Sequence, residues 1–208
     1  MEFLDVFGKG GPVVVAIALL SLVGLMVFLE RLWSTRLSLV FPTSLAAELL
    51  ELLREGKLEQ AEKLVDKGRS ALAVMVRSGL VQTDSREEMK TRMEERGAME
   101  VASLARYTGV LSTVSTLAPL LGLLGTVTGM VQVFKAVEVS TEPQIGELAG
   151  GIWEALLTTA TGLTVAIPAL IAFKYLESRV DRIAVSLESY GLYLLDRVHD
   201  KNTEGSEQ

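Results

Sequence analysis

Glu154 lies inside an apolar stretch of the sequence that is long enough to cross a lipid bilayer as a helix. The stretch covers residues 150–173, GGIWEALLTTATGLTVAIPALIAF, and it also carries the hydroxyls of Thr158, Thr159, Thr161 and Thr164. A carboxylate in the hydrocarbon core is costly, and desolvation favours its protonated form. Carboxyl and hydroxyl groups at such a depth form proton relays or polar contacts between helices, and the alternative for Glu154 is that its side chain reaches the outer headgroups. These interpretations stay open.

The spacing in this stretch predicts a helix with two faces of different chemistry. One face carries small residues and one hydroxyl: Ala155, Thr159, Gly162, Ala166 and Ala169. The other carries the carboxylate and two hydroxyls: Glu154, Thr158, Thr161, Val165, Pro168 and Ala172. Because neither face is suited to lipid alone, we expect the helix to contact two things, such as neighbouring helices and a polar cavity.

A second apolar stretch, residues 108–134, contains no ionisable side chain. Small and hydroxyl residues recur along it in steps of four and three, which places them on one helical face: Thr108, Ser112, Ser115, Pro119, Gly122, Thr126 and Gly129. Close packing of membrane helices would explain such a stripe. A ring of several copies, with Thr126 and Thr159 facing a central lumen, would explain it equally well, and both interpretations stay open.

The whole chain of 208 residues divides into apolar and charged segments. We predict an all-α membrane protein with three transmembrane helices, of which the second and third extend into a cytoplasmic helical domain. The predicted segments are a short periplasmic N-terminus (1–11), the first span (12–33), a helical region (34–107), the second span (108–134), a periplasmic loop (135–149), the third span (150–173), an amphipathic helix (174–200) and a disordered tail (201–208).

Orientation follows from the basic residues near the ends of the spans. Arginine and lysine gather at the ends that adjoin the helical region and the C-terminal helix: Arg31, Arg36, Arg92, Arg96, Arg106, Lys174, Arg179 and Arg182. The opposite ends have only Lys9 and Lys135. The chain is therefore expected to have its N-terminus outside and its C-terminus in the cytoplasm.

Composition argues against several classes of function. The chain has no cysteine, its single histidine is His199 in a polar segment, and no paired carboxylates converge, so we expect neither an enzyme nor a metal or cofactor site. The net charge of −6 argues against a nucleic-acid partner. One carboxyl group does not make a pump, so a second protein would have to supply what these helices lack.

Two motifs in the second and third stretches resemble a known family. The segments APLLGLLGTVTGM and GGIWEALLTTATGLTVAIPALI are similar to the second and third membrane helices of the MotA/TolQ/ExbB proton-channel family, over residues 116–175. The glutamate in the third helix favours the ExbB/TolQ branch over the flagellar stators. The resemblance implies a pentamer in the bacterial inner membrane whose pore holds the membrane helices of a dimeric ExbD- or TolR-type partner, with a TonB- or TolA-type protein as a further partner.

The resemblance also implies roles for individual residues. The family's pore threonines correspond to Thr126 and Thr159, and its third-helix glutamate corresponds to Glu154, while the proton-binding aspartate belongs to the partner. The remaining candidates line the pore or pack helices: Ser115, Pro119, Gly122, Gly129, Thr158, Gly162 and Pro168. The implied function is a motor subunit that uses the proton motive force for outer-membrane transport (as in ExbB) or envelope maintenance (as in TolQ). The alternative is a membrane scaffold whose polar stripes only pack helices. H⁺ or Na⁺ as the ion, and relay or structural clamp as the role of Glu154, stay open.

Overall fold

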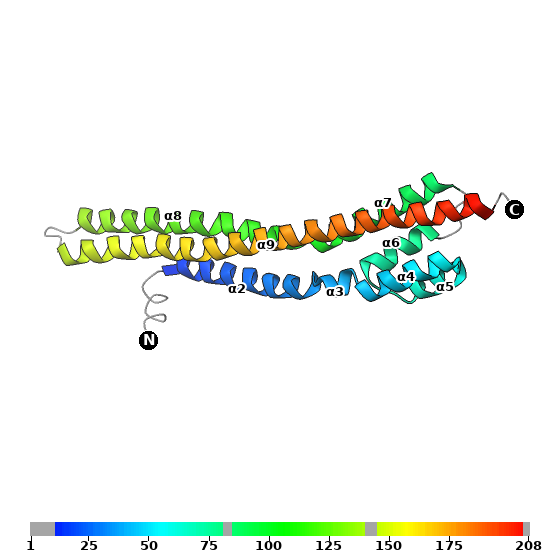
Figure 1. The fold of residues 1–208 in the computed structure, drawn as a ribbon. Coiled ribbons are helices and arrows are strands. Elements are labelled where there is room, and N and C mark those ends of the chain that lie inside the picture. Colours follow the sequence, from blue (N-terminus) through cyan, green and yellow to red (C-terminus); the bar gives the residue numbers. More distant parts are fainter. Residues whose placement is uncertain (1–10, 81–84, 140–144, 206–208) are drawn as a thin grey trace. The chain divides into compact units, whose positions relative to one another are not determined.

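The computed structural model describes residues 11–80, 85–139 and 145–205, and these ranges form helices and short connections without a strand. The chain divides into two compact units (Figure 1). The membrane unit consists of the chain up to Arg31 together with Tyr107–Tyr175, and the helical unit consists of Leu32–Arg106 together with the chain from Leu176 onward. The prediction of an all-α membrane protein with three spanning helices is confirmed.

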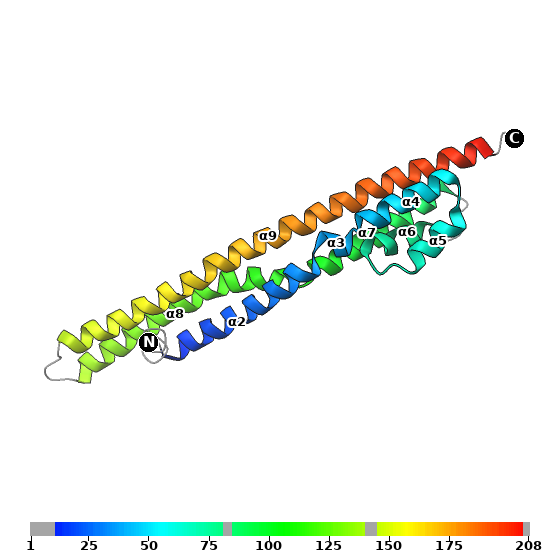
Figure 2. The same ribbon diagram turned by 60° about the horizontal axis from the view of Figure 1, so that its bottom comes forward.

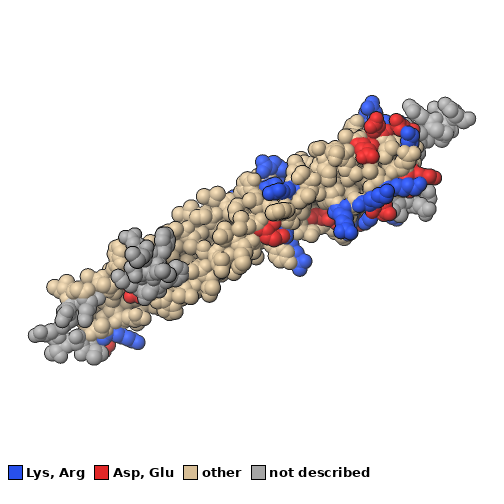
Figure 3. Space-filling model, turned by 90° about the horizontal axis from the view of Figure 1, so that it is seen from below, with Lys and Arg blue, Asp and Glu red and all other residues tan. Residues whose placement is uncertain are grey.

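The membrane unit contains α2 (Gly11–Ser34), α8 (Thr108–Val139) and the first part of α9 (Ile145–Gly205). By length and composition, these three helices can cross a membrane. Figures 1 and 2 show α8 and α9 side by side in this unit. On the face drawn in Figure 3, few charged side chains lie over the membrane unit, whereas Lys, Arg, Asp and Glu gather over the helical unit. An uncharged surface of this kind suits contact with lipid or with other apolar helices.

Helix α2 packs onto the start of α8 through a small residue and a buried cation. Gly24 of α2 is buried, and a Cβ at this position would lie 3.5 Å from the Val114 side chain. At the end of α2, the guanidinium of Arg31 lies 5.0 Å from the centre of the Tyr107 ring, a cation–π distance. Arg31 is only 7% exposed, so this contact fixes the end of α2 against the residue that precedes α8.

The helical unit contains α3 (Leu37–Val40), α4 (Thr43–Glu55), α5 (Leu58–Asp66), α6 (Ala71–Leu80), α7 (Arg86–Ala105) and the last part of α9. Helix α4 stops where the sequence predicts, because Gly56 takes a left-handed conformation with φ 78° that other residues adopt at a cost. Helix α7 is capped at its start by Ser85, whose side chain accepts a hydrogen bond from the Glu87 backbone N–H. The core of the unit includes the fully buried residues Leu49, Leu72, Leu187 and Leu194.

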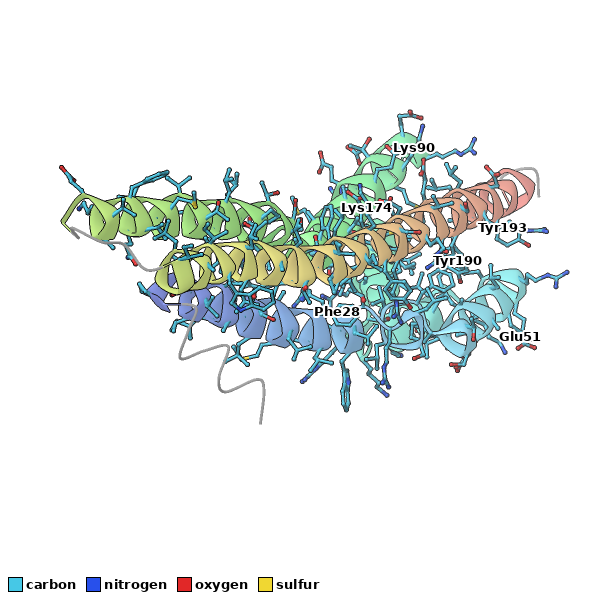
Figure 4. The ribbon with its side chains drawn as sticks, turned by 90° about the vertical axis from the view of Figure 1, so that its left-hand side faces the viewer. Phe28, Glu51, Lys90, Lys174, Tyr190 and Tyr193 are labelled. Carbon is cyan, nitrogen blue, oxygen red and sulfur yellow. The ribbon has the colours of Figure 1, made fainter. Side chains whose placement is uncertain are left out.

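Tyr190 connects α9 to the other helices of this core. Its side chain points from α9 toward α4 (Figure 4), where the hydroxyl donates a hydrogen bond of 2.7 Å to the Ala46 carbonyl. The ring meets Phe41 edge to face, with centroids 5.5 Å apart. A buried tyrosine whose hydroxyl has a partner adds both apolar contact area and a specific orientation.

Three helix boundaries differ from the predicted ones. The predicted loop of residues 135–149 is mostly helical, because α8 continues through Val139 and α9 begins at Ile145, and lysine, alanine and glutamate all favour helix. Residues 140–144 of that loop lie outside the described residues. Helix α9 also runs past Lys201, the predicted start of the tail, to Gly205, since no proline follows Pro168 in the sequence. A single long helical stretch runs from Arg86 to Glu138, with only Arg106 and Tyr107 between α7 and α8, so the prediction that the second spanning helix extends into the helical region is confirmed.

Candidate functional site

Glycines bring α8 and α9 into backbone contact. A Cβ on Gly162 of α9 would lie 2.5 Å from the Ala118 carbonyl oxygen, and one on Gly122 of α8 would lie 2.9 Å from the Thr159 Cα. A Cβ on Gly125 would lie only 2.3 Å from Thr158 Oγ1. These distances are shorter than real contacts, so larger residues at the three glycines would push the two helices apart.

The remaining contacts set an antiparallel register between α8 and α9. A Cβ on Gly129 would lie 3.0 Å from the Cβ of Ala155, and Gly151 faces Val133. Since Gly122 lies opposite Thr159, Thr126 is level with the segment between Ala155 and Thr159. The register therefore brings the sequence-predicted residues of the two helices to the same depth.

Two threonines of α9 donate hydrogen bonds to a single carbonyl of α8. The hydroxyls of Thr158 and Thr159 lie 3.2 Å and 3.0 Å from the Gly122 oxygen. Thr158 also donates to the Ala155 carbonyl over 2.7 Å. Hydroxyl bonds between helices stabilise membrane bundles where small residues allow a close approach.

The burial of Thr158 corrects one prediction about the faces of α9. Thr158 is only 3% exposed and belongs to the buried face that α8 covers, together with Ala155, Gly162, Ala166 and Ala169. The predicted grouping put Thr159 on this face and Thr158 beside Glu154. Both residues fit the helical spacing, and the position of α8 decides between them. In the structure Thr159 lies half-buried at the edge of the contact.

Glu154 is half-buried, and its Oε1 atom lies 3.7 Å from the position that a Cβ on Gly11 would occupy. Gly11 is the first residue of α2, so the carboxylate lies near the beginning of that helix. Within the described residues, the structure records no hydrogen bond or ion pair for Glu154. The described part of the chain therefore supplies no basic partner for the Glu154 carboxylate.

The other predicted residues are distributed between the buried contact and the outer surface. Thr126 is half-buried and donates to the Leu123 carbonyl of its own helix over 2.7 Å. Ser115 similarly donates to Ser112. Pro119 is half-buried and Pro168 is exposed, and both lie inside helices that continue past them. Thr126 and Pro168 thus keep surface that their own chain does not cover.

Sequence reasoning missed two contacts of this unit. Gly151 packs against Val133, and Gly24 of α2 packs against Val114. The only signal for either is a glycine in an apolar helix, where glycine is costly unless close packing requires it. Within the described residues, no cluster of three or more His, Asp or Glu side chains could hold a metal ion.

The fold and the contact between α8 and α9 define a class: an all-α membrane protein in which two spanning helices form a close antiparallel pair that carries hydroxyls and one carboxyl. The sequence profile of the MotA/TolQ/ExbB proton channel family matches residues 51–189. The chain belongs to this family, in its ExbB/TolQ branch.

Three relatives match different shares of the chain. The ExbB-like protein 1 of Synechocystis sp. is 34% identical over 185 residues, which are 85% of this chain and 71% of the relative. The biopolymer transport protein ExbB of Pseudomonas putida is 32% identical over 62% of this chain, and the Tol-Pal system protein TolQ of Haemophilus influenzae is 38% identical over 46% of it. The matched parts span 42% and 40% of these two relatives.

Proposed function

We propose that this chain is a channel subunit of an inner-membrane motor and not an enzyme. Several copies, a pentamer, form a ring whose pore holds the membrane helices of a dimeric ExbD- or TolR-type partner. Protons that move down the membrane potential release about 2.3 kcal/mol per charge per 100 mV. The complex uses this energy for outer-membrane transport or for envelope maintenance, through a TonB- or TolA-type protein.

The observation that carries the proposal is the state of Glu154. This carboxylate is half-buried in the spanning part of α9, and the described part of its own chain offers it no ion pair. A group of this kind in a membrane is a candidate for proton transfer once a partner or a neighbouring copy completes its surroundings. Thr126 lies on the facing helix at a similar depth and keeps exposed surface. We place Glu154, Thr126 and Thr159 on the proton pathway.

The proposed orientation has the N-terminus in the periplasm and the helical unit in the cytoplasm, as the arginine and lysine distribution favours. Names of relatives support both branches of the function, since one is a biopolymer transport protein and another a Tol-Pal system protein. Co-purification with a TonB-type or a TolA-type protein would distinguish the two.

Native mass spectrometry of the complex, purified with and without its ExbD- or TolR-type partner, tests the assembly. We expect a pentamer that binds a partner dimer. Proton flux into liposomes that contain a pH-sensitive dye then tests the pathway. Glu154→Gln, which keeps the side chain's size, should lower the flux by about tenfold or more. Asp181→Asn is the matched control, because Asp181 is an exposed carboxylate of α9 in the helical unit.

Two results would contradict these proposals separately. A monomer or dimer that does not bind the partner would rule out the ring. Normal proton flux through an intact Glu154→Gln complex would rule out the role of the carboxyl group in proton transfer. The second candidate function, a membrane scaffold, is favoured by one observation: the Thr159 hydroxyl already bonds to Gly122 within the same chain. A scaffold would form the complex without any proton flux.

A further inference from the structure

A groove with a volume of about 490 Å³ lies within the helical unit, between α7 and the last part of α9. Five small residues line it and leave the space open: Gly97, Ala98, Ala102, Ala184 and Gly191. Sites for drug-sized molecules have volumes of this order, with mostly apolar walls and a few polar groups. The groove lies outside the spanning helices that form the proposed channel.

The floor of the groove consists of two methionines. Met75 and Met93 are 3% and 2% exposed, and their methyl groups lie 3.6 Å and 3.5 Å from the Cβ position of Gly191. Methionine side chains are flexible and polarisable, so they adapt to ligands of different shapes.

Packing does not explain the glycine in the α9 wall. The distances at Gly191 are ordinary van der Waals contacts, so an alanine would fit there without moving its neighbours. Glycine inside a helix is less favourable than alanine. Glycine at this wall therefore keeps space open although it lowers the stability of the helix, and occupation of that space by a ligand would explain why.

The rim of the groove carries an excess of negative charge. Lys90, which Figure 4 shows on α7, lies 3.9 Å from Glu94 one turn further along the helix. Glu188 on the α9 side is exposed, and among the described residues the structure records no cation paired with it. A ligand with a positive charge would complement this carboxylate, while leucines of α9 would contact an apolar body.

We propose that this groove binds a small molecule with an apolar body and a cationic amine, the amine lying beside Glu188. The proposal does not depend on proton conduction, because every residue of the groove belongs to the helical unit.

The absence of cysteine from the chain allows a direct test. Ala98→Cys places a thiol on the exposed part of the groove wall, and Ser103→Cys is the matched control on the same helix, exposed but outside the groove. Reaction of each thiol with N-ethylmaleimide is followed by mass spectrometry, with the full complex in lipid nanodiscs. The probes are 4-phenylbutylamine, 4-phenylbutan-1-ol and 4-phenylbutanoate, which share a body and differ in the charge of the head.

We expect saturating amine to slow the labelling of Ala98→Cys to about a tenth of its rate, since such sites cover most of a ligand's surface. The alcohol should protect less, the carboxylate should not protect, and the control should not respond. Adding Glu188→Gln should weaken the protection by the amine about two- to fivefold, the range of an exposed ion pair. Ala184→Cys, on the opposite wall, is a second reporter if the first variant does not fold.

Equal protection by all three probes, or by none, would overturn the proposal. A thiol of Ala98→Cys that stays unreactive without any probe, while Ser103→Cys reacts, would also overturn it. That result would mean that another protein chain covers the groove in the complex.

Discussion

The side-chain hydroxyl of Thr159 on α9 donates a hydrogen bond of 3.0 Å to the backbone carbonyl of Gly122 on α8. Thr158, the preceding residue, donates to the same oxygen over 3.2 Å, but it is almost fully buried whereas Thr159 lies at the edge of the contact. Two adjacent hydroxyls with the same acceptor and different exposure allow packing and conduction to be separated by experiment.

Thr159→Val keeps the shape of the side chain and removes its hydroxyl. Hydrogen bonds between membrane helices contribute about 0.6 kcal/mol on average, so the unfolding free energy should fall by less than about 1 kcal/mol. If Thr159 lies on the proton pathway, the liposome flux should nevertheless be lost, and Thr159→Ser should retain it. Thr158→Val is the control: it loses the same kind of bond but should keep its flux. Equal flux in both valine variants would assign Thr159 to packing.

Gly162→Ala should destabilise the membrane unit strongly for a change of one methyl group. The new Cβ would lie 2.5 Å from the Ala118 carbonyl oxygen, a backbone atom that can move only with its helix. Overpacking of this kind costs about 1–3 kcal/mol. Denaturant titration of the purified protein, followed by circular dichroism, measures the effect.

Gly150→Ala is the matched variant, on the same helix and with the same change. Nothing lies within 4 Å of the Cβ position at Gly150, so this variant should be as stable as the parent or more stable, by up to about 1 kcal/mol. A Gly162→Ala variant as stable as Gly150→Ala would contradict the contact between α8 and α9 at Gly162.

Tyr190→Phe should destabilise the helical unit. The hydroxyl donates a hydrogen bond to the Ala46 carbonyl in a buried position, and the net contribution of such a bond to stability is about 0.5–1.5 kcal/mol. Tyr193→Phe provides the comparison, because Tyr193 is 43% exposed and bonds only to the exposed Arg197 within the described residues. It should change stability by less than about 0.5 kcal/mol. Equal effects would contradict the packing of α9 against α4.

Gly56→Ala should destabilise the connection between α4 and α5. Gly56 has φ 78°, and an L-residue in the left-handed region costs about 1–2 kcal/mol. Gly191→Ala should be neutral or stabilising, because Gly191 lies in a helix with room for a methyl group. The thermal unfolding temperature should therefore fall in Gly56→Ala and should stay the same or rise in Gly191→Ala. A loss in Gly191→Ala as large as that in Gly56→Ala would contradict the space seen beside α9.

The sequence predicts the three spanning helices and the end of α4, because long apolar runs and a glycine after a leucine-rich helix are strong local signals. It does not predict which threonine of α9 is buried. Ala155 fits a helical face with either Thr158 or Thr159, and only the position of Gly125 on the other helix, against the Thr158 side chain, selects Thr158.

Other features depend on contacts between segments that are far apart in the chain. The docking of α2 rests on Gly24 and Val114, and a single glycine in a leucine-rich helix has no periodicity that would identify a partner. The groove requires Gly97 and Gly191 to flank the same methionine, Met75, which only the folded helical unit brings about.

The glycine contacts between α8 and α9 also have a mechanical meaning. Helices in backbone contact at Gly122 and Gly162 resist sliding, because a shift along the contact drives a peptide group into its neighbour, and separation would break the two hydrogen bonds to the Gly122 carbonyl. The pair therefore moves as one rigid unit. Any movement that accompanies ion passage takes place at the outer surfaces of this helix pair, where it meets α2, lipid or another chain, and not along the contact between α8 and α9.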